Sequence, residues 1–221
     1  FWWTDMKSDK LQLMVHGRNI ADLRPSISHD NIIITDVKTL ENPNYLFINL
    51  EISKNIQPGQ FDINFLKNNK TIIKHNYTIL ERELNSMHRN GFSSKDVIYL
   101  ITPDRYANGN PKNDTVSELT EKANRKNKDS RHGGDLKGII DHLDYISDMG
   151  FTQIWLNPVL ENNQPNYSYH GYSTTDYYNI DARFGSNQLY KELSAKAKEK
   201  GIGIIMDLIL NHIGSGHWWM N

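Results

Sequence analysis

The stretch GIGIIMDLILNH, residues 201–212, places polar side chains inside and directly after an apolar run. Asp207 lies within that run, and Asn211 and His212 follow its end. A carboxylate inside a buried strand must pair with a cation or with hydrogen-bond donors, because an unpaired buried charge is very costly. Asp207 is therefore half of a structural ion pair or part of a polar site, and His212 is a packing residue or a ligand contact.

A second segment, TPDRYANGNPKNDT at residues 102–115, is rich in side-chain oxygen atoms. Its carboxylates and amides come from Asp104, Asn108, Asn110, Asn113 and Asp114. Ca²⁺ takes about six to eight such ligands, although the spacing is not that of an EF-hand. The same composition also fits a surface turn. Asp135, in HGGDL, adds a ligand to this site or caps the helix that follows it.

A third segment, NYSYHGYSTTDYYNID at residues 166–181, gathers tyrosines around His170. Aromatic rings stack on the apolar faces of sugars, and a histidine offers a polar partner to sugar hydroxyls. Tyrosine clusters also pack in ordinary protein interiors. Taken alone, this segment leaves a ligand role and a packing role open.

Short apolar runs and helical patterns must position these residues. The three runs are DVIYLI at 96–101, FTQIWLNP at 151–158 and GIGIIMDLIL at 201–210. They predict parallel strands buried on both faces, with Trp155 in the core. Apolar spacing over residues 136–149 predicts one helix that Gly150 closes, and residues 186–200 predict another. This order predicts the beginning of a β/α fold.

Residues 11–80 show short β-rich runs divided by turn residues, which predict a small antiparallel sandwich. Phe61, Ile63 and Phe65 alternate with polar residues, the pattern of a strand with one wet face. Asn68 and Asn69 join two such runs, which predicts a hairpin. The polar stretch that follows reads as an interdomain linker.

The bulk composition limits the kinds of partner that this protein can have. The chain has 221 residues, a formal net charge of -1, 38% hydrophobic residues and no cysteine. This length allows two domains, and the even charge argues against nucleic acid or an anionic membrane as the main partner. No run reaches the roughly 20 apolar residues of a membrane span, and disulfides and thiolate metal sites are excluded. The start, FWWTDM, has no initiator methionine or signal-like run, so we expect a processed or trimmed chain.

Several ordered motifs resemble the α-amylase family, glycoside hydrolase family 13. They are DVIYLITPDRYANGNPKND, GGDLKGIIDHLDYISDMGFTQIWLNPVLEN, YHGYSTTDYYNIDARFG and GIGIIMDLILNHIG. The start, FWWTDMKSDKLQLMVHGRNIAD, resembles the N-domain of the cyclomaltodextrinase and neopullulanase branch, especially Bacteroidetes-type enzymes. The resemblance implies an all-β immunoglobulin-like sandwich over residues 1–84, a linker over 85–95, and an incomplete TIM (β/α)8 barrel of three strands over 96–221.

The resemblance also implies residue roles. Asp207 would hold an arginine from the following strand, Asn211 would be a structural or ion-binding amide, and His212 would donate to the sugar at the cleavage subsite. Tyr172 would stack on that same sugar, with His170 beside it. The implied ligands of a structural Ca²⁺ are Asn108, Asn110, Asn113, Asp114, Gly133 and Asp135.

The family's catalytic carboxylates match no residue of this chain. A retaining glycosidase needs two carboxylates about 5 Å apart, and we expect the nucleophile and the acid/base beyond Asn221. The implied activity is hydrolysis of α-1,4 links in maltodextrin, cyclodextrin or pullulan, with this chain inactive alone. The alternatives are a non-catalytic carbohydrate-binding or assembly module and, among enzymes, an α-amylase or oligo-1,6-glucosidase. The resemblance further implies a homodimer through the N-terminal domain and a bacterial, periplasmic location.

Overall fold

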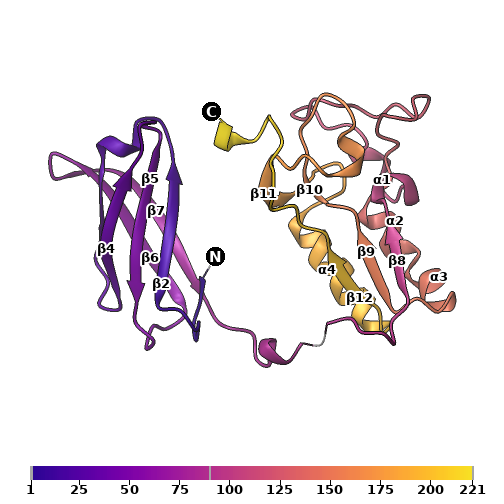
Figure 1. The fold of residues 1–221 in the computed structure, drawn as a ribbon, viewed down its shortest axis with the longest axis horizontal. Coiled ribbons are helices and arrows are strands. Elements are labelled where there is room, and N and C mark those ends of the chain that lie inside the picture. The colour runs from indigo at the N-terminus through magenta and orange to yellow at the C-terminus, as the bar shows by residue number, and fades with distance from the viewer. Residues whose placement is uncertain (1, 90, 221) are drawn as a thin grey trace. The chain divides into compact units, whose positions relative to one another are not determined.

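The computed structural model describes residues 2–89 and 91–220, which belong to two compact units. The first unit is Phe1–Asn90 and the second is Gly91–Asn221. Figure 1 draws the elements of both units, which we describe one at a time. None of the described helices is long and apolar enough to cross a membrane.

The first unit consists of two β-sheets with strand orders β1-β7-β6-β3 and β2-β5-β4. Strands β1 and β7 pair in parallel, and the other strand pairs are antiparallel. The bounds are β1 Trp2–Trp3, β2 Lys10–His16, β3 Arg24–Ile27, β4 Ile32–Thr39, β5 Tyr45–Ile52, β6 Gly59–Lys67 and β7 Lys70–Leu80, with 3-10 helices η1 at Ile20–Asp22 and η2 at Ser86–His88.

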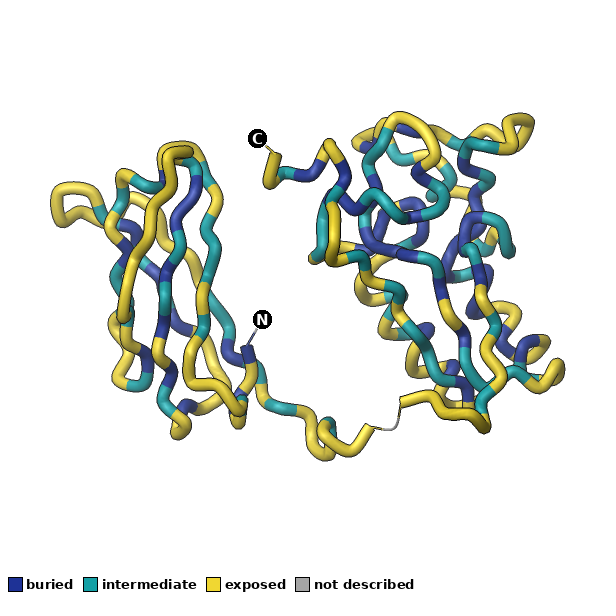
Figure 2. The backbone as a smooth tube through the Cα atoms, in the orientation of Figure 1, coloured by how far each residue is buried: buried dark blue, intermediate teal, exposed yellow. Residues whose placement is uncertain are grey.

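Side chains from both sheets of the first unit share one apolar core. Phe61, Ile63 and Phe65 point inward from β6 and are buried, which confirms the predicted alternation, and Ile48 packs with them from β5. Figure 2 shows this alternation of buried and exposed positions along the strands. The immunoglobulin-like topology of these sheets stays a prediction.

The predicted hairpin between β6 and β7 is confirmed, because Lys67 pairs with Lys70 across the turn. Asn68 and Asn69 form the turn with φ angles of 52° and 61°. A two-residue hairpin loop of this kind needs left-handed backbone at both positions, and asparagine tolerates it better than most residues. The turn chemistry therefore sets the register of the longest strand pair.

The second unit is built on a parallel sheet with strand order β12-β9-β8, as the apolar runs predicted. The sheet strands are β8 Ile98–Ile101, β9 Gln153–Leu156 and β12 Gly203–Met206, and β10 Leu160–Glu161 pairs with β11 Asp176–Ile180. The helices are α1 Pro103–Tyr106, η3 Pro111–Asn113, α2 Leu136–Asp141, α3 Leu143–Asp148, η4 Ser168–His170, α4 Asn187–Glu199 and η5 Trp218–Met220. The order of strands and helices is that of the start of a β/α barrel.

The single helix predicted over residues 136–149 is wrong, because the structure divides it into α2 and α3 at His142. His142 leaves the helical region, with φ −112° and ψ 12°, and its N–H bonds to the carbonyl of Ile139. The imidazole Nδ1 lies 2.7 Å from the carbonyl of Gly138, the oxygen that the N–H of His142 would take in a continuous helix. The side chain thus replaces the backbone at this turn.

The two faces of the parallel sheet differ. Ile101, Ile154 and Leu156 are buried against the helices, whereas Leu100 is 56% exposed and Trp155 is 39% exposed on the opposite face. Leu100 and Trp155 are neighbours in register, so the opposite face forms a partly exposed apolar strip. The predictions of burial on both faces and of a core Trp155 are wrong for the described residues, because helices cover only one face.

Candidate functional site

Asp207 lies directly after β12, at the carboxyl edge of the parallel sheet, and not inside a strand as predicted. One oxygen, Oδ2, accepts hydrogen bonds from the Tyr172 hydroxyl at 2.9 Å and from Trp155 Nε1 at 3.3 Å. Among the described residues it has no ion pair within 4 Å. Two neutral donors therefore contact one oxygen of the carboxylate, and Trp155 is a site residue that no motif indicated. The arginine partner of Asp207 stays a prediction.

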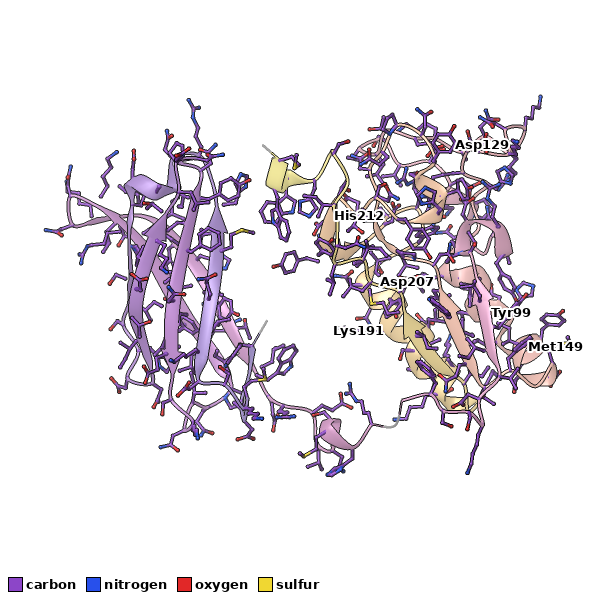
Figure 3. The ribbon with its side chains drawn as sticks, in the orientation of Figure 1. Tyr99, Asp129, Met149, Lys191, Asp207 and His212 are labelled. Atoms are coloured by element: carbon purple, nitrogen blue, oxygen red, sulfur yellow. The ribbon has the colours of Figure 1, made fainter. Side chains whose placement is uncertain are left out.

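The chain that follows β12 is fastened to the tyrosine segment. His212 Nε2 lies 2.8 Å from the carbonyl oxygen of Tyr172, and His212 Nδ1 contacts the side-chain oxygen of the exposed Asn211. The Tyr177 hydroxyl donates to the carbonyls of Ile209 and His212. Figure 3 shows Asp207 and His212 on this segment. These contacts bring residues 40 positions apart in the sequence to one place.

His170 and Tyr172 are joined through a short turn. Tyr172 donates its backbone N–H to His170 Nδ1 at 2.9 Å, which leaves Nε2 as the protonated nitrogen of the neutral ring. Burial lowers the pKa of His170, an effect that the charge of Glu121 opposes. Burial, with Asp207 as the next cause, raises the pKa of the Tyr172 hydroxyl. Both side chains are therefore neutral hydrogen-bonding groups near pH 7.

Gly171 makes this turn possible. Its φ is 85°, and a Cβ at this position would lie 2.0 Å from the carbonyl oxygen of Pro158. Only glycine fits so close to the backbone of the segment that follows β9. The close approach sets the distance between the turn and the sheet edge, and with it the position of Tyr172 over Asp207.

The site as a whole offers an aromatic ring, two imidazoles and one carboxylate at a sheet edge. Of the predicted residues, the structure brings together His170, Tyr172, Asp207, Asn211 and His212. Rings and neutral donors of this kind bind hydroxyl-rich ligands by stacking and hydrogen bonding. The arrangement can orient a sugar.

The segment predicted to bind a cation forms a separate cluster around Asp135. Asp135 is fully buried, and its carboxylate accepts backbone N–H groups from Gly109, Asn110 and Gly138 at 3.1, 2.9 and 2.7 Å. The bond from Gly138 makes it the N-cap of α2. Asp135 therefore caps a helix and also fixes the Asn-rich loop.

Two of the other predicted metal ligands, Asn108 and Gly133, lie against Asp114. Its carboxylate accepts from Asn108 Nδ2 at 2.6 Å and from Arg125 at 2.9 Å. A Cβ on Gly133, where φ is 91°, would lie 2.6 Å from this carboxylate. Asn113 Oδ1 is buried without a hydrogen-bond partner. Within residues 2–89 and 91–220 no group of three His, Cys, Asp or Glu side chains could hold a metal ion, so any ion here would depend on amide and carbonyl oxygens.

The second unit also contains a buried network of charges, and two of its residues, Asp181 and Arg183, stand in the motif YHGYSTTDYYNIDARFG without having been predicted as site residues. Arg183 donates to both oxygens of Asp181 at 2.9 and 2.7 Å, and the two residues are 1% and 0% exposed. Arg131 is 1% exposed and lies 3.9 Å from Asp181. Charged residues are rarely buried unless they are paired, and only the tertiary structure shows which of these side chains are buried together.

Two family descriptions match the chain. The description "Alpha amylase, catalytic domain" matches residues 100–221, and "Cyclomaltodextrinase, N-terminal" matches residues 1–83. The first match covers the whole site, and the second covers the two-sheet unit.

Individual relatives give the same picture over the second unit. The chain is 45% identical over 123 residues to the beta/alpha-amylase of Paenibacillus polymyxa, covering 55% of this chain and 10% of the relative. It is 40% identical over 124 residues to neopullulanase 2 of Thermoactinomyces vulgaris, covering 56% and 20%. The solved structure of an Anoxybacillus alpha-amylase matches with 42% identity and a TM-score of 0.51, covering 57% and 26%.

This chain thus spans between a tenth and about a quarter of the length of these relatives. None of them supports the narrower likeness to Bacteroidetes-type enzymes. The catalytic-domain match, by contrast, extends over more than half of the chain and includes Tyr172, Asp207 and His212. The chain belongs to the alpha-amylase family.

Proposed function

We propose that this chain is the N-terminal part of a retaining α-glucan hydrolase that cleaves α-1,4 links in maltodextrin, cyclodextrin or pullulan. One observation carries the proposal: at the carboxyl edge of the parallel sheet Tyr172 contacts Asp207 through its hydroxyl and His212 through its carbonyl oxygen. That edge is where β/α barrels build their active sites. The names of the relatives, which include neopullulanase and cyclomaltodextrinase, support the substrate class.

In this proposal the described residues bind and orient the sugar. The Tyr172 ring stacks on one sugar face, and the imidazoles of His170 and His212 meet its hydroxyls. Asp207 keeps Oδ1 available for an arginine, because Tyr172 and Trp155 both donate to Oδ2. The nucleophile and the acid/base, which a retaining mechanism needs about 5 Å apart, come from strands outside residues 2–220.

The exposed sheet face supports a larger barrel. Leu100 and Trp155, which are neighbours in register on this face, are 56% and 39% exposed, although apolar runs of this kind belong to strands covered on both faces. We propose that further barrel strands cover this strip in the whole protein. A complete barrel of this type has about 250 residues, roughly twice the second unit.

Substitution of Tyr172 tests the proposal in the full-length protein. Tyr172→Ala removes the stacking ring and should raise KM for maltoheptaose about fivefold to tenfold. Tyr172→Phe keeps the ring and should raise KM less than Tyr172→Ala does, since it loses only the hydrogen bond to the Asp207 carboxylate. Release of reducing ends from maltoheptaose, cyclodextrin and pullulan measures the activity.

Tyr145→Ala is the matched control, because Tyr145 is exposed on α3 away from the site. Maltoheptaose binding without any hydrolysis by the full-length wild type would favour a carbohydrate-binding module and contradict the enzyme. Hydrolysis that Tyr172→Ala leaves unchanged would contradict the sugar contact.

We further propose a structural Ca²⁺ at the Asn-rich loop. The orphaned Asn113 Oδ1 and the Asp114 carboxylate, close to the Gly133 backbone, suit a hard cation. Asn108, Asn110 and Asp135 would complete the set together with a carbonyl of Gly133. A bound ion would supply charge that holds this loop in place. Addition of EDTA should lower the melting temperature of the wild type and leave Asp114→Ala unchanged.

The homodimer and the periplasmic location stay predictions. Sedimentation velocity of the full-length protein, with and without residues 1–84, tests whether the first unit mediates dimerisation. Fractionation of the source cells tests the location. A monomer at micromolar concentration would contradict the dimer.

A further inference from the structure

Two buried charged side chains, those of Glu121 and Arg131, form hydrogen bonds with the backbone of Ser168. We call this pair of contacts the grip on Ser168. Glu121 Oε2 accepts the N–H of Ser168 at 2.7 Å. Arg131 Nη1 donates to the carbonyl oxygen of Ser168 at 3.3 Å and approaches its hydroxyl at 3.4 Å. Glu121 is 7% exposed, Arg131 is 1% exposed and Ser168 is fully buried. The main chain of one residue is therefore held from both sides by a charge.

The gripped residue begins the turn that presents His170 and Tyr172. Tyr167, directly before it, has φ 60°, and Gly171 has φ 85°. A left-handed conformation costs a tyrosine of the order of 1 kcal/mol and persists only where the surroundings impose it. The two contacts to Ser168 supply that constraint, because they fix the peptide groups on both sides of its Cα.

The grip is itself rigidly supported. Arg183 Nη1 donates to the carbonyl oxygen of Glu121 at 2.9 Å while its other nitrogens bind Asp181. The Arg131 guanidinium lies 4.4 Å from the ring centre of Phe184. These partners bury both ends of the grip. Arg183 thus ties the backbone of Glu121 to Asp181, whereas Nε and Nη2 of Arg131 have no hydrogen-bond partner among the described residues. The position of Glu121 is therefore the better supported of the two.

We propose that Glu121 and Arg131 are positioning residues that fix the Ser168–His170 turn and so set where His170 and Tyr172 meet the sugar. The inference rests on the proposed function. Both residues act through the backbone of Ser168 and leave the side chains of the turn free for the ligand. Two residues that lie between the first two motifs in the sequence thereby control the affinity of the site.

Substitutions of Glu121 in the full-length protein test the proposal. Glu121→Ala leaves the buried N–H of Ser168 without an acceptor and should raise KM for maltoheptaose about tenfold, with a smaller change in kcat. Glu121→Gln keeps an acceptor oxygen and should stay within about threefold. Glu118→Ala is the matched control, since Glu118 is exposed on the same loop and bonds to Ser117.

Amide hydrogen exchange of Ser168 gives a readout that does not need activity. Exchange should accelerate in Glu121→Ala, stay near wild type in Glu121→Gln, and not change in Glu118→Ala. If Glu121→Ala does not fold, Glu121→Asp tests the contact instead, because its shorter side chain withdraws the carboxylate from the Ser168 N–H and keeps the charge. Faster exchange of Ser168 in Glu121→Asp supports the proposal, and unchanged exchange overturns it. A tenfold loss in Glu121→Gln would overturn it in favour of a charge effect on the sugar.

The result that overturns the proposal is distinct from the result that overturns the enzyme. A wild type that neither binds nor cleaves α-glucan refutes the proposed function, while the exchange of Ser168 still decides whether the grip exists. An active wild type in which Glu121→Ala matches Glu118→Ala in both KM and exchange refutes the positioning role alone.

Discussion

The two units bury different kinds of side chain. Among residues 2–89, Thr4 is the single buried polar side chain, and the interior is otherwise formed by residues such as Ile48 and Phe65. The described part of the second unit buries many polar and charged groups, namely Asp104, Glu121, Arg131, Asp135, Asn162, Ser168, Thr174, Thr175, Asp181, Arg183 and His217. The first unit is stabilised by apolar packing, and the second also by buried hydrogen bonds and ion pairs.

This difference follows from what each unit has to position. Two sheets with alternating side chains bury their apolar faces against each other, and no polar group needs to enter. In the second unit, long loops at the sheet edge carry the site, and their backbone groups need partners away from water. Buried charged side chains supply those partners. We therefore expect substitutions of these side chains to destabilise the second unit. Four experiments follow, ordered by expected effect.

The largest effect should come from breaking the buried ion pair. Asp181→Ala leaves the guanidinium of Arg183 buried without its carboxylate and should destabilise the second unit by about 3–5 kcal/mol. Urea unfolding of the full-length protein measures the change. Asp62→Ala in the first unit is the control, because its ion pair with Lys74 is exposed and should contribute nothing measurable. Equal losses of unfolding free energy in the two variants would contradict the difference between the two units.

The next experiment compares the two faces of the parallel sheet. Ile154→Ala, on the packed face, should cost about 2–5 kcal/mol. Leu100→Ala, on the exposed strip, should cost less than about 1 kcal/mol in the 221-residue chain, because little apolar area is lost. Denaturant unfolding measures the free-energy cost of each substitution in the 221-residue chain and in the full-length protein, and so compares the strip without and with the proposed covering strands. A Leu100→Ala cost that does not rise in the full-length protein would contradict the covering strands.

Acidification should affect the second unit through the half-buried His170 and the buried His217. Burial lowers the pKa of His170 and of His217 in the folded chain, below the ordinary value of about 6.5. The unfolded chain therefore binds more protons than the folded chain as pH falls through 6.5 towards the depressed values, so stability falls in that window. Melting temperatures at pH 7.5 and 5.5 should differ, and His217→Gln should reduce the difference. Equal losses with and without His217 would contradict its part.

The smallest effect should come from the hairpin of the first unit. Asn69→Gly removes the strain of a side chain at φ 61° and should stabilise that unit by a few tenths of a kcal/mol. Asn76→Gly, inside β7, is the control and should destabilise, because glycine weakens a strand interior. Thermal unfolding of the first unit measures both. Stabilisation by both variants would show that the turn is not the cause.

Local patterns predicted much of the fold. The alternation of Phe61, Ile63 and Phe65 predicted their burial, and the three apolar runs predicted the parallel strands. The prediction of one helix over 136–149 was wrong because the contact of His142 Nδ1 with a backbone carbonyl is invisible to apolar spacing. Trp155 was wrongly predicted to be a core residue for a similar reason, since the sequence of an apolar strand does not show which of its faces other elements cover.

The sequence by itself determined the family, through ordered motifs, and the strands and turns, because these depend on residues close together along the chain. Only the tertiary structure decided that Asp207 is satisfied by Tyr172 and Trp155, and that Glu121 and Arg131 hold Ser168. Those partners are separated by 35 or more residues, and no local periodicity reports such distances. Which donors and acceptors contact a charged side chain is therefore decided by the tertiary structure.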